Sequence, residues 1–258
     1  MLQTKVIAAM NPLLSTALPG VAAPVLFILL AALGLRRWGG GRAGFVLAGC
    51  MAAAFFFGSV ALAGWPPLPP VTTTQWIGLL ALAAGVLAFP AAALPPVGRW
   101  LFRTAVIAAF LWTAARPKFA AAWTPRQGVL SLAAATVLVT GLWGLLQRRS
   151  RSVGPLRFVF PLGAGMALGA LLFFQEGSLL LAQWAALAAL ITGAAWLGLA
   201  VAAGKPVPME APLGVVFPVY GVIAVNALWY TDLPVSWALA LWAGLALPVV
   251  IGLRGKKL

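Results

Sequence analysis

Polar side chains that could contact a solute are few in this chain, and Asn226 is the most informative of them. Asn226 stands inside a long apolar run. An amide in such a run is costly unless it finds a partner. We therefore expect Asn226 either to bond a neighbouring helix or to contact a solute, and both interpretations stay open. Gln183, Thr192, Thr136 and Thr140 are weaker candidates, because Thr can bond the backbone of its own helix.

A second polar set falls where the apolar runs end on one predicted side of a membrane. Its members are Gln75, Arg116, Lys118, Arg126, Gln175, Glu176, Tyr230 and Asp232. One interpretation is a charged vestibule or gate in which carboxylates face cations, and the other is a group of solvated charges at the membrane surface. As substrate-binding residues we predict Asn226, Glu176, Asp232, Gln175, Tyr230 and Arg116. Glu210 stands among Pro206, Pro208 and Pro212, and we expect it to be a solvated loop carboxylate.

Prolines within the apolar runs could permit helix bending. Each removes one hydrogen bond of its helix, and the freed carbonyl needs another partner or a wet cavity. Val159-Phe160-Pro161 and Val216-Phe217-Pro218 repeat the same three residues 57 positions apart. We predict hinges at Pro161 and Pro218, while the ordinary abundance of proline in membrane helices is the alternative.

Enzyme chemistry has little support in the residue inventory. The chain has no His and one Cys, Cys50, so His-based acid–base catalysis and an intrachain disulfide are both excluded. We find no metalloprotease, nucleophile-elbow or phosphate-loop motif. We therefore predict no catalytic residue, no metal and no cofactor, and we regard a lipid-modifying enzyme as a third hypothesis.

Composition places the chain in a membrane. Its mean hydropathy is +1.04 and only 8% of its residues are charged, whereas soluble proteins carry roughly 25%. The net charge of +14 comes from short clusters along the whole chain rather than from one basic face. This distribution argues against nucleic acid as a partner and favours contact with anionic lipid headgroups.

Apolar runs long enough to cross a bilayer, about 20 residues each, recur along the chain. The sequence predicts an all-α, polytopic bundle of about nine membrane helices, in a single membrane domain over residues 1–258. The bundle covers 20–258, after an N-terminal segment, 1–19, on the outer side; cleavage of residues 1–23 is an alternative. The predicted spans are 20–37, 43–64, 76–95, 100–115, 127–146, 157–174, 178–200, 213–230 and 236–253.

The positions of Lys and Arg predict the orientation, because short cytoplasmic loops collect these residues. With nine spans and an outer N-terminus, the C-terminus is cytoplasmic. The inner set is Arg36, Arg37, Arg42, Arg99, Arg103, Arg148, Arg149, Arg151, Arg157, Lys205, Arg254, Lys256 and Lys257, against Lys5, Arg116, Lys118 and Arg126 outside. Without the weakest span, 100–115, the dense cluster from Arg148 to Arg157 would fall outside. The pattern suits a bacterial cytoplasmic membrane.

The even spacing of the spans suggests four helical hairpins after the first span. Their expected starts, near residues 43, 100, 157 and 213, lie about 57 residues apart. Repetition and paired prolines are typical of transport proteins. The leading hypothesis is a small-molecule permease or channel, and the second is a noncatalytic membrane subunit or assembly factor that holds partners. A membrane-protein partner or a homo-oligomer is possible.

Overall fold

The computed structural model describes residues 25–26, 28–29, 41–70, 72–201, 207–231 and 233–251. Eight helices and no strand occur in this described part, as the sequence predicts for an all-α bundle. The helices are α2 (Gly41–Ala63), α3 (Thr73–Ala93), α4 (Pro96–Ala121), α5 (Pro125–Ser150), α6 (Pro155–Gln175), α7 (Leu179–Val201), α8 (Glu210–Tyr230) and α9 (Val235–Ile251).

Local sequence explains where several helices begin. Pro96, Pro125 and Pro155 open α4, α5 and α6, in the first turn, where a missing N–H loses no helical hydrogen bond. Thr124 caps α5: its Oγ1 accepts from the Gln127 N–H at 3.3 Å, and the Gln127 Oε1 accepts from the Thr124 N–H at 3.1 Å. This reciprocal pair satisfies two backbone donors at the helix start.

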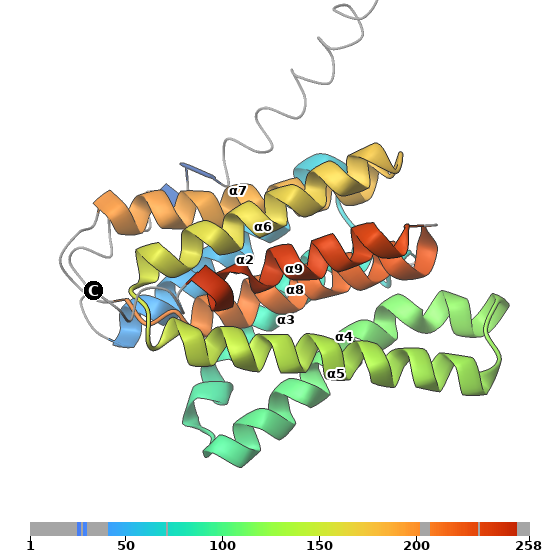
Figure 1. The fold of residues 1–258 in the computed structure, drawn as a ribbon, viewed down its shortest axis with the longest axis horizontal. Coiled ribbons are helices and arrows are strands. Elements are labelled where there is room, and N and C mark those ends of the chain that lie inside the picture. Colours follow the sequence, from blue (N-terminus) through green and yellow to red (C-terminus); the bar gives the residue numbers. More distant parts are fainter. Residues whose placement is uncertain are drawn as a thin grey trace, which may run out of the picture.

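The helices run back and forth between two ends of the bundle (Figure 1). We name these ends after the first and last residues of α8. The Glu210 end contains the starts of α2, α4, α6 and α8, and the Tyr230 end contains the turns that follow them. The Glu210 end is the side predicted to be cytoplasmic.

Helix α8 lies at the centre of the bundle. It packs against α2, α3, α4, α5 and α7, and nearly every side chain from Pro212 to Ala227 is buried. Helices α6, α7 and α9 form one flank, and α4 and α5 form the other (Figure 1). A Cβ at Gly165 of α6 would overlap the carbonyl oxygen of Gly244 of α9, so these two glycines allow the close approach of their helices.

Six of the described helices are long and apolar enough to cross a membrane: α2, α3, α5, α6, α7 and α8. This indicates a multi-pass membrane protein. Helix α4 extends the predicted span 100–115 at both ends, to 26 residues, but it is not among the six. Helix α9 contributes a shorter apolar segment. The predicted span 20–37 lies outside the described residues except for Val25, Leu26, Ile28 and Leu29, so the count of nine stays a prediction.

Candidate functional site

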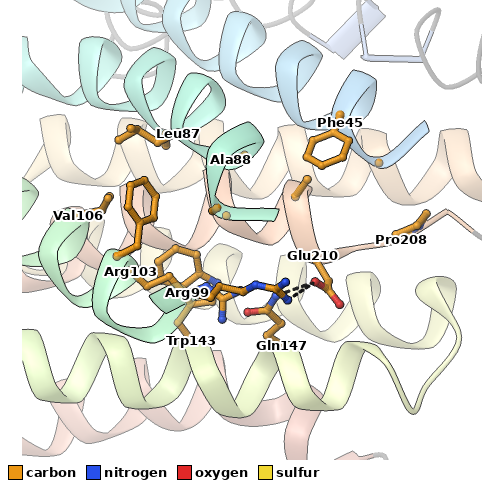
Figure 2. Close-up of a pocket in the computed structure, with 16 residues that line it drawn as sticks. Phe45, Leu87, Ala88, Arg99, Arg103, Val106, Trp143, Gln147, Pro208 and Glu210 are labelled. Atoms are coloured by element: carbon orange, nitrogen blue, oxygen red, sulfur yellow. Dashed lines mark hydrogen bonds and ion pairs between the residues drawn. The ribbon is translucent and has the colours of Figure 1, made fainter. Parts of the chain in front are cut away.

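A cavity of about 300 Å³ lies at the Glu210 end, between α2, α3, α4, α5 and α8 (Figure 2). Its polar lining comes from Arg99 and Arg103 of α4, Gln147 of α5 and Glu210 of α8. Most of the remaining wall is apolar and includes Phe45, Leu87, Ala88, Phe102 and Val106. We call it the arginine cavity. It combines a small charged patch with apolar walls, which is the usual make-up of a small-molecule site.

Helical spacing brings the polar groups of the arginine cavity together. Arg99 and Arg103 are one turn apart on α4, and Trp143 and Gln147 are one turn apart on α5, so each pair shares a helix face. Helices α4 and α5 form an antiparallel hairpin. Its two polar faces meet the first residue of α8, where Glu210 lies (Figure 2).

Both carboxylate oxygens of Glu210 are engaged. The Arg151 Nε donates to Oε1 at 2.5 Å, the Gln147 Nε2 donates to Oε2 at 3.2 Å, and the Arg99 Nη1 lies 3.6 Å from Oε2. The hydrogen bond to Glu210 raises the pKa of the Arg151 guanidinium. The expectation of a solvated loop carboxylate was therefore wrong: Glu210 begins α8 and joins it to α4 and α5.

Arg103 differs from its neighbours, because no ion pair joins it to a carboxylate among the described residues. Its guanidinium carbon lies 5.2 Å from the centre of the Trp143 ring, and its side chain is only 8% exposed. Trp143 also lines the cavity, and its buried Nε1 has no acceptor within the described part of the chain. A cation and a donor without an anionic partner therefore lie at the same wall.

A second cavity, of about 280 Å³, lies at the Tyr230 end. Helices α3, α7 and α8 and their adjoining turns line it, through Thr72, Thr73, Thr74, Ser178, Leu180, Leu181, Asn226, Tyr230 and Thr231. We call it the asparagine cavity. Asn226 is 4% exposed, and neither its Oδ1 nor its Nδ2 has a hydrogen-bond partner among the described residues. The structure thus brings the predicted residue to a cavity and shows no bond from it to any other described helix.

Tyr230 links the asparagine cavity to α4. Its hydroxyl donates to the Ala114 carbonyl at 2.8 Å, and the Lys118 Nζ lies 5.0 Å from the centre of its ring. Thr73 of α3 donates to the same carbonyl at 3.5 Å. These contacts hold α3, α4 and α8 together at this end of the bundle.

The other described residues predicted to lie at the outer mouth do not line the asparagine cavity. Gln75 accepts from the Thr72 N–H at 3.1 Å and so contributes to the start of α3. Gln175 and Arg116 are exposed, and Glu176, which is half-exposed, makes no ion pair with any cation among the described residues. The turn of Glu176 and the turn between α4 and α5 lie on opposite flanks of the bundle (Figure 1). Asp232 lies outside the described residues.

The two predicted hinge prolines are both buried inside helices. Pro161 lies in α6. Pro218 lies in α8, between Gly214 of the arginine cavity and Asn226 of the asparagine cavity. Pro218 has no N–H to donate to the Gly214 carbonyl, and Gly214 lines the arginine cavity. The missing bond therefore lies next to that cavity, and the hinge role itself stays a prediction.

Sequence reasoning did not single out Gln147, or Glu210 with its partners, as a site. The signal that could have found them is the repetition of polar residues one turn apart on two adjacent helices, Arg99 with Arg103 and Trp143 with Gln147. No family model, no curated protein and no solved structure matches this chain. The fold and its cavities therefore carry the functional argument.

Proposed function

We propose that this multi-pass membrane protein is a permease that moves a small solute between the arginine cavity and the asparagine cavity. The observation that carries the proposal is the path of α8: its first residue borders one cavity, and Asn226, near its last turn, borders the other. Two cavities with polar side chains in their linings border this one buried helix, and they would give a solute a binding site at each end of the bundle.

The segment of α8 between the cavities is packed. Val215, Val219 and Val222 are no more than 2% exposed, and Tyr220 donates from its hydroxyl to the Met166 carbonyl at 3.3 Å. Solute passage therefore requires a conformational change, as in alternating access. Pro218, with its missing helical bond, is where we propose that α8 bends.

We propose that the Glu210 end faces the cytoplasm and that the membrane is a bacterial cytoplasmic membrane, with the N-terminus outside. The support is the basic residues at that end: Arg42, Arg99, Arg103, Arg148, Arg149, Arg151 and Arg157 all lie on the predicted inner side. Anionic headgroups would then contact the exposed members of this set.

Thiol labelling from each face of the membrane tests the proposal without any knowledge of the solute. Cys50, the one cysteine of the chain, is first replaced by Ala. A single cysteine is then placed in each cavity, Ala211→Cys or Asn226→Cys, and a membrane-impermeant methanethiosulfonate is applied to vesicles of known orientation. We expect Ala211→Cys to react from the cytoplasmic face and Asn226→Cys from the outer face.

The matched control is Val219→Cys, which places a thiol on the packed part of the same helix. It should react far more slowly than either cavity position. Labelling of both cavity positions from the same face, or of neither position from any face, would remove the permease proposal.

A second function, that of a noncatalytic membrane subunit, has one observation in its favour. An apolar groove of about 860 Å³ runs along α6 and α7 and is lined by small residues, among them Gly163, Ala164, Ala167, Ala186 and Gly193. Small residues allow a further helix to approach closely. Purification from native membranes in mild detergent tests this alternative, because a stoichiometric partner favours the subunit and a lone chain or homo-oligomer favours the permease.

A further inference from the structure

We infer that the arginine cavity binds an organic anion, with the acidic group on Arg103 and an apolar body against Phe45, Leu87 and Val106. This inference rests on the proposed function, since it names the class of solute for one of its two cavities. Carboxylate, sulfonate and phosphate groups share the required chemistry, because a guanidinium can donate two parallel hydrogen bonds to any of them.

The first step of the argument is the cost of burying Arg103. A cation with little exposed surface is favoured by an anionic partner, and the Arg103 guanidinium has none among the described residues. The contact with the Trp143 ring, 5.2 Å from the guanidinium carbon to the ring centre, provides a weak attraction but no negative charge. Arg103 therefore lies at the cavity wall without a carboxylate partner, and an anion in the cavity would supply one.

The second step is that Glu210 interacts with residues other than Arg103. Its Oε1 accepts from Arg151, and its Oε2 accepts from Gln147 and lies 3.6 Å from Arg99. Among the described residues, three cations, Arg99, Arg103 and Arg151, surround this one acid, so positive charge is in excess here. An anion bound at Arg103 would offset part of this excess.

The third step concerns the walls of the cavity. Figure 2 shows Phe45, Leu87 and Val106 around the space above Arg99, Arg103 and Gln147. An inorganic anion would leave these walls facing water, whereas an aromatic ring or a short alkyl chain would cover them. A volume of about 300 Å³ lies at the small end of the range for ligand sites. The structure thus favours an acidic group attached to one small apolar body.

Equilibrium binding of radiolabelled benzenesulfonate to the protein in phosphatidylcholine nanodiscs tests the inference. Benzenesulfonate carries its charge at all relevant pH values, and benzenesulfonamide has nearly the same shape without the charge. We expect saturable binding that unlabelled benzenesulfonate displaces and the sulfonamide does not. Arg103→Gln should weaken binding at least tenfold, and Arg103→Lys should retain part of it.

Arg157→Gln is the matched control, because it removes an exposed cation from the same end of the bundle and should leave binding unchanged. A second arm adds phosphatidylglycerol to the nanodiscs. Competition by this lipid with benzenesulfonate binding to the unmodified protein would identify a lipid headgroup as the anion, whereas benzenesulfonate binding that the lipid does not reduce would identify a free solute.

Two results would overturn the inference. One is equal binding of benzenesulfonate to the unmodified protein and to Arg103→Gln, and the other is the absence of any Arg103-dependent binding of benzenesulfonate or phosphatidylglycerol. If Arg103→Gln does not fold, competition by benzenesulfonamide tests the inference instead. Displacement of benzenesulfonate by benzenesulfonamide would show that the site does not recognise the charge. The binding experiment reports recognition of an anion at Arg103, whereas thiol labelling reports access to each cavity from one face of the membrane. The two experiments can therefore fail independently.

Discussion

The two cavities of this bundle differ in whether their principal polar side chain has partners. At the Glu210 end, a carboxylate gathers Arg99, Arg151 and Gln147 through ion pairs and hydrogen bonds. At the Tyr230 end, the amide of Asn226 is buried with no partner among the described residues. The first arrangement joins α8 to α4 and α5, whereas the second makes no such bond among the described residues. The charged contacts between helices thus centre on Glu210, and the side chains proposed to contact a solute, Arg103 at one end and Asn226 at the other, take no part in them.

The largest effect on stability is expected from Glu210→Gln. This change removes the carboxylate that accepts from Arg151 and Gln147 and leaves the surrounding cations without their acid. Hydrogen bonds to charged groups contribute about 1.5 to 3 kcal/mol each, and because the Glu210 side chain is 37% exposed we expect a net loss of about 2 kcal/mol. Reversible unfolding in mixed micelles measures the free energy.

Glu176→Gln is the control for Glu210→Gln, because Glu176 makes no ion pair within the described part of the chain. Its effect should stay within about 0.5 kcal/mol. Equal losses from the two substitutions would break the comparison between the two ends.

Asn226→Leu is expected to separate stability from function. An apolar side chain of similar size removes a buried amide that has no bond to replace, so the free energy of unfolding should rise by about 1 kcal/mol. Solute movement should be lost at the same time. Unfolding in micelles and uptake in proteoliposomes measure the two effects. A fall in stability would mean that the amide has a structural partner, and the asparagine cavity would lose its role.

Tyr230→Phe removes only the hydroxyl that donates to the Ala114 carbonyl. The loss of one such bond should lower the free energy of unfolding by about 1 kcal/mol or less, while the ring stays in place beside Lys118. The same unfolding measurement checks this value. A loss as large as that of Glu210→Gln would mean that the Tyr230 end is held as firmly as the Glu210 end.

The smallest effect on stability is expected from Pro218→Ala. Alanine restores the N–H that can donate to the Gly214 carbonyl, so α8 should become stiffer with little change in folding free energy. We expect solute binding to be unchanged and the rate of movement to fall several-fold. Pro161→Ala in α6 is the matched variant, and faster movement in either variant would argue against a hinge at that proline.

Much of the fold was accessible from the sequence, because apolar runs and loop prolines mark where helices lie. Each of α2 to α9 corresponds to a predicted span, although Pro96 starts α4 several residues earlier than hydropathy alone indicates. Hydropathy also underestimated α4 because Arg103 interrupts its apolar run. The interruption is the feature that places a cation in the arginine cavity.

The site was harder to predict, since it depends on contacts between distant residues. Glu210 is 59 residues from Arg151 and 63 from Gln147 along the chain. No pattern near Glu210 in the sequence predicts these partners. Asn226 was predictable because its cost is local: one amide among apolar neighbours. Pairing between helices carries no comparable local signal.

Uptake into proteoliposomes tests the central claim, movement of an organic anion along α8, most directly. Purified protein is reconstituted in phosphatidylcholine, and radiolabelled benzenesulfonate is supplied outside. We predict accumulation with time that exceeds protein-free liposomes and that falls at least tenfold in Arg103→Gln and in Asn226→Leu. Benzenesulfonate that binds to the protein in nanodiscs yet shows no uptake above protein-free liposomes would contradict the account.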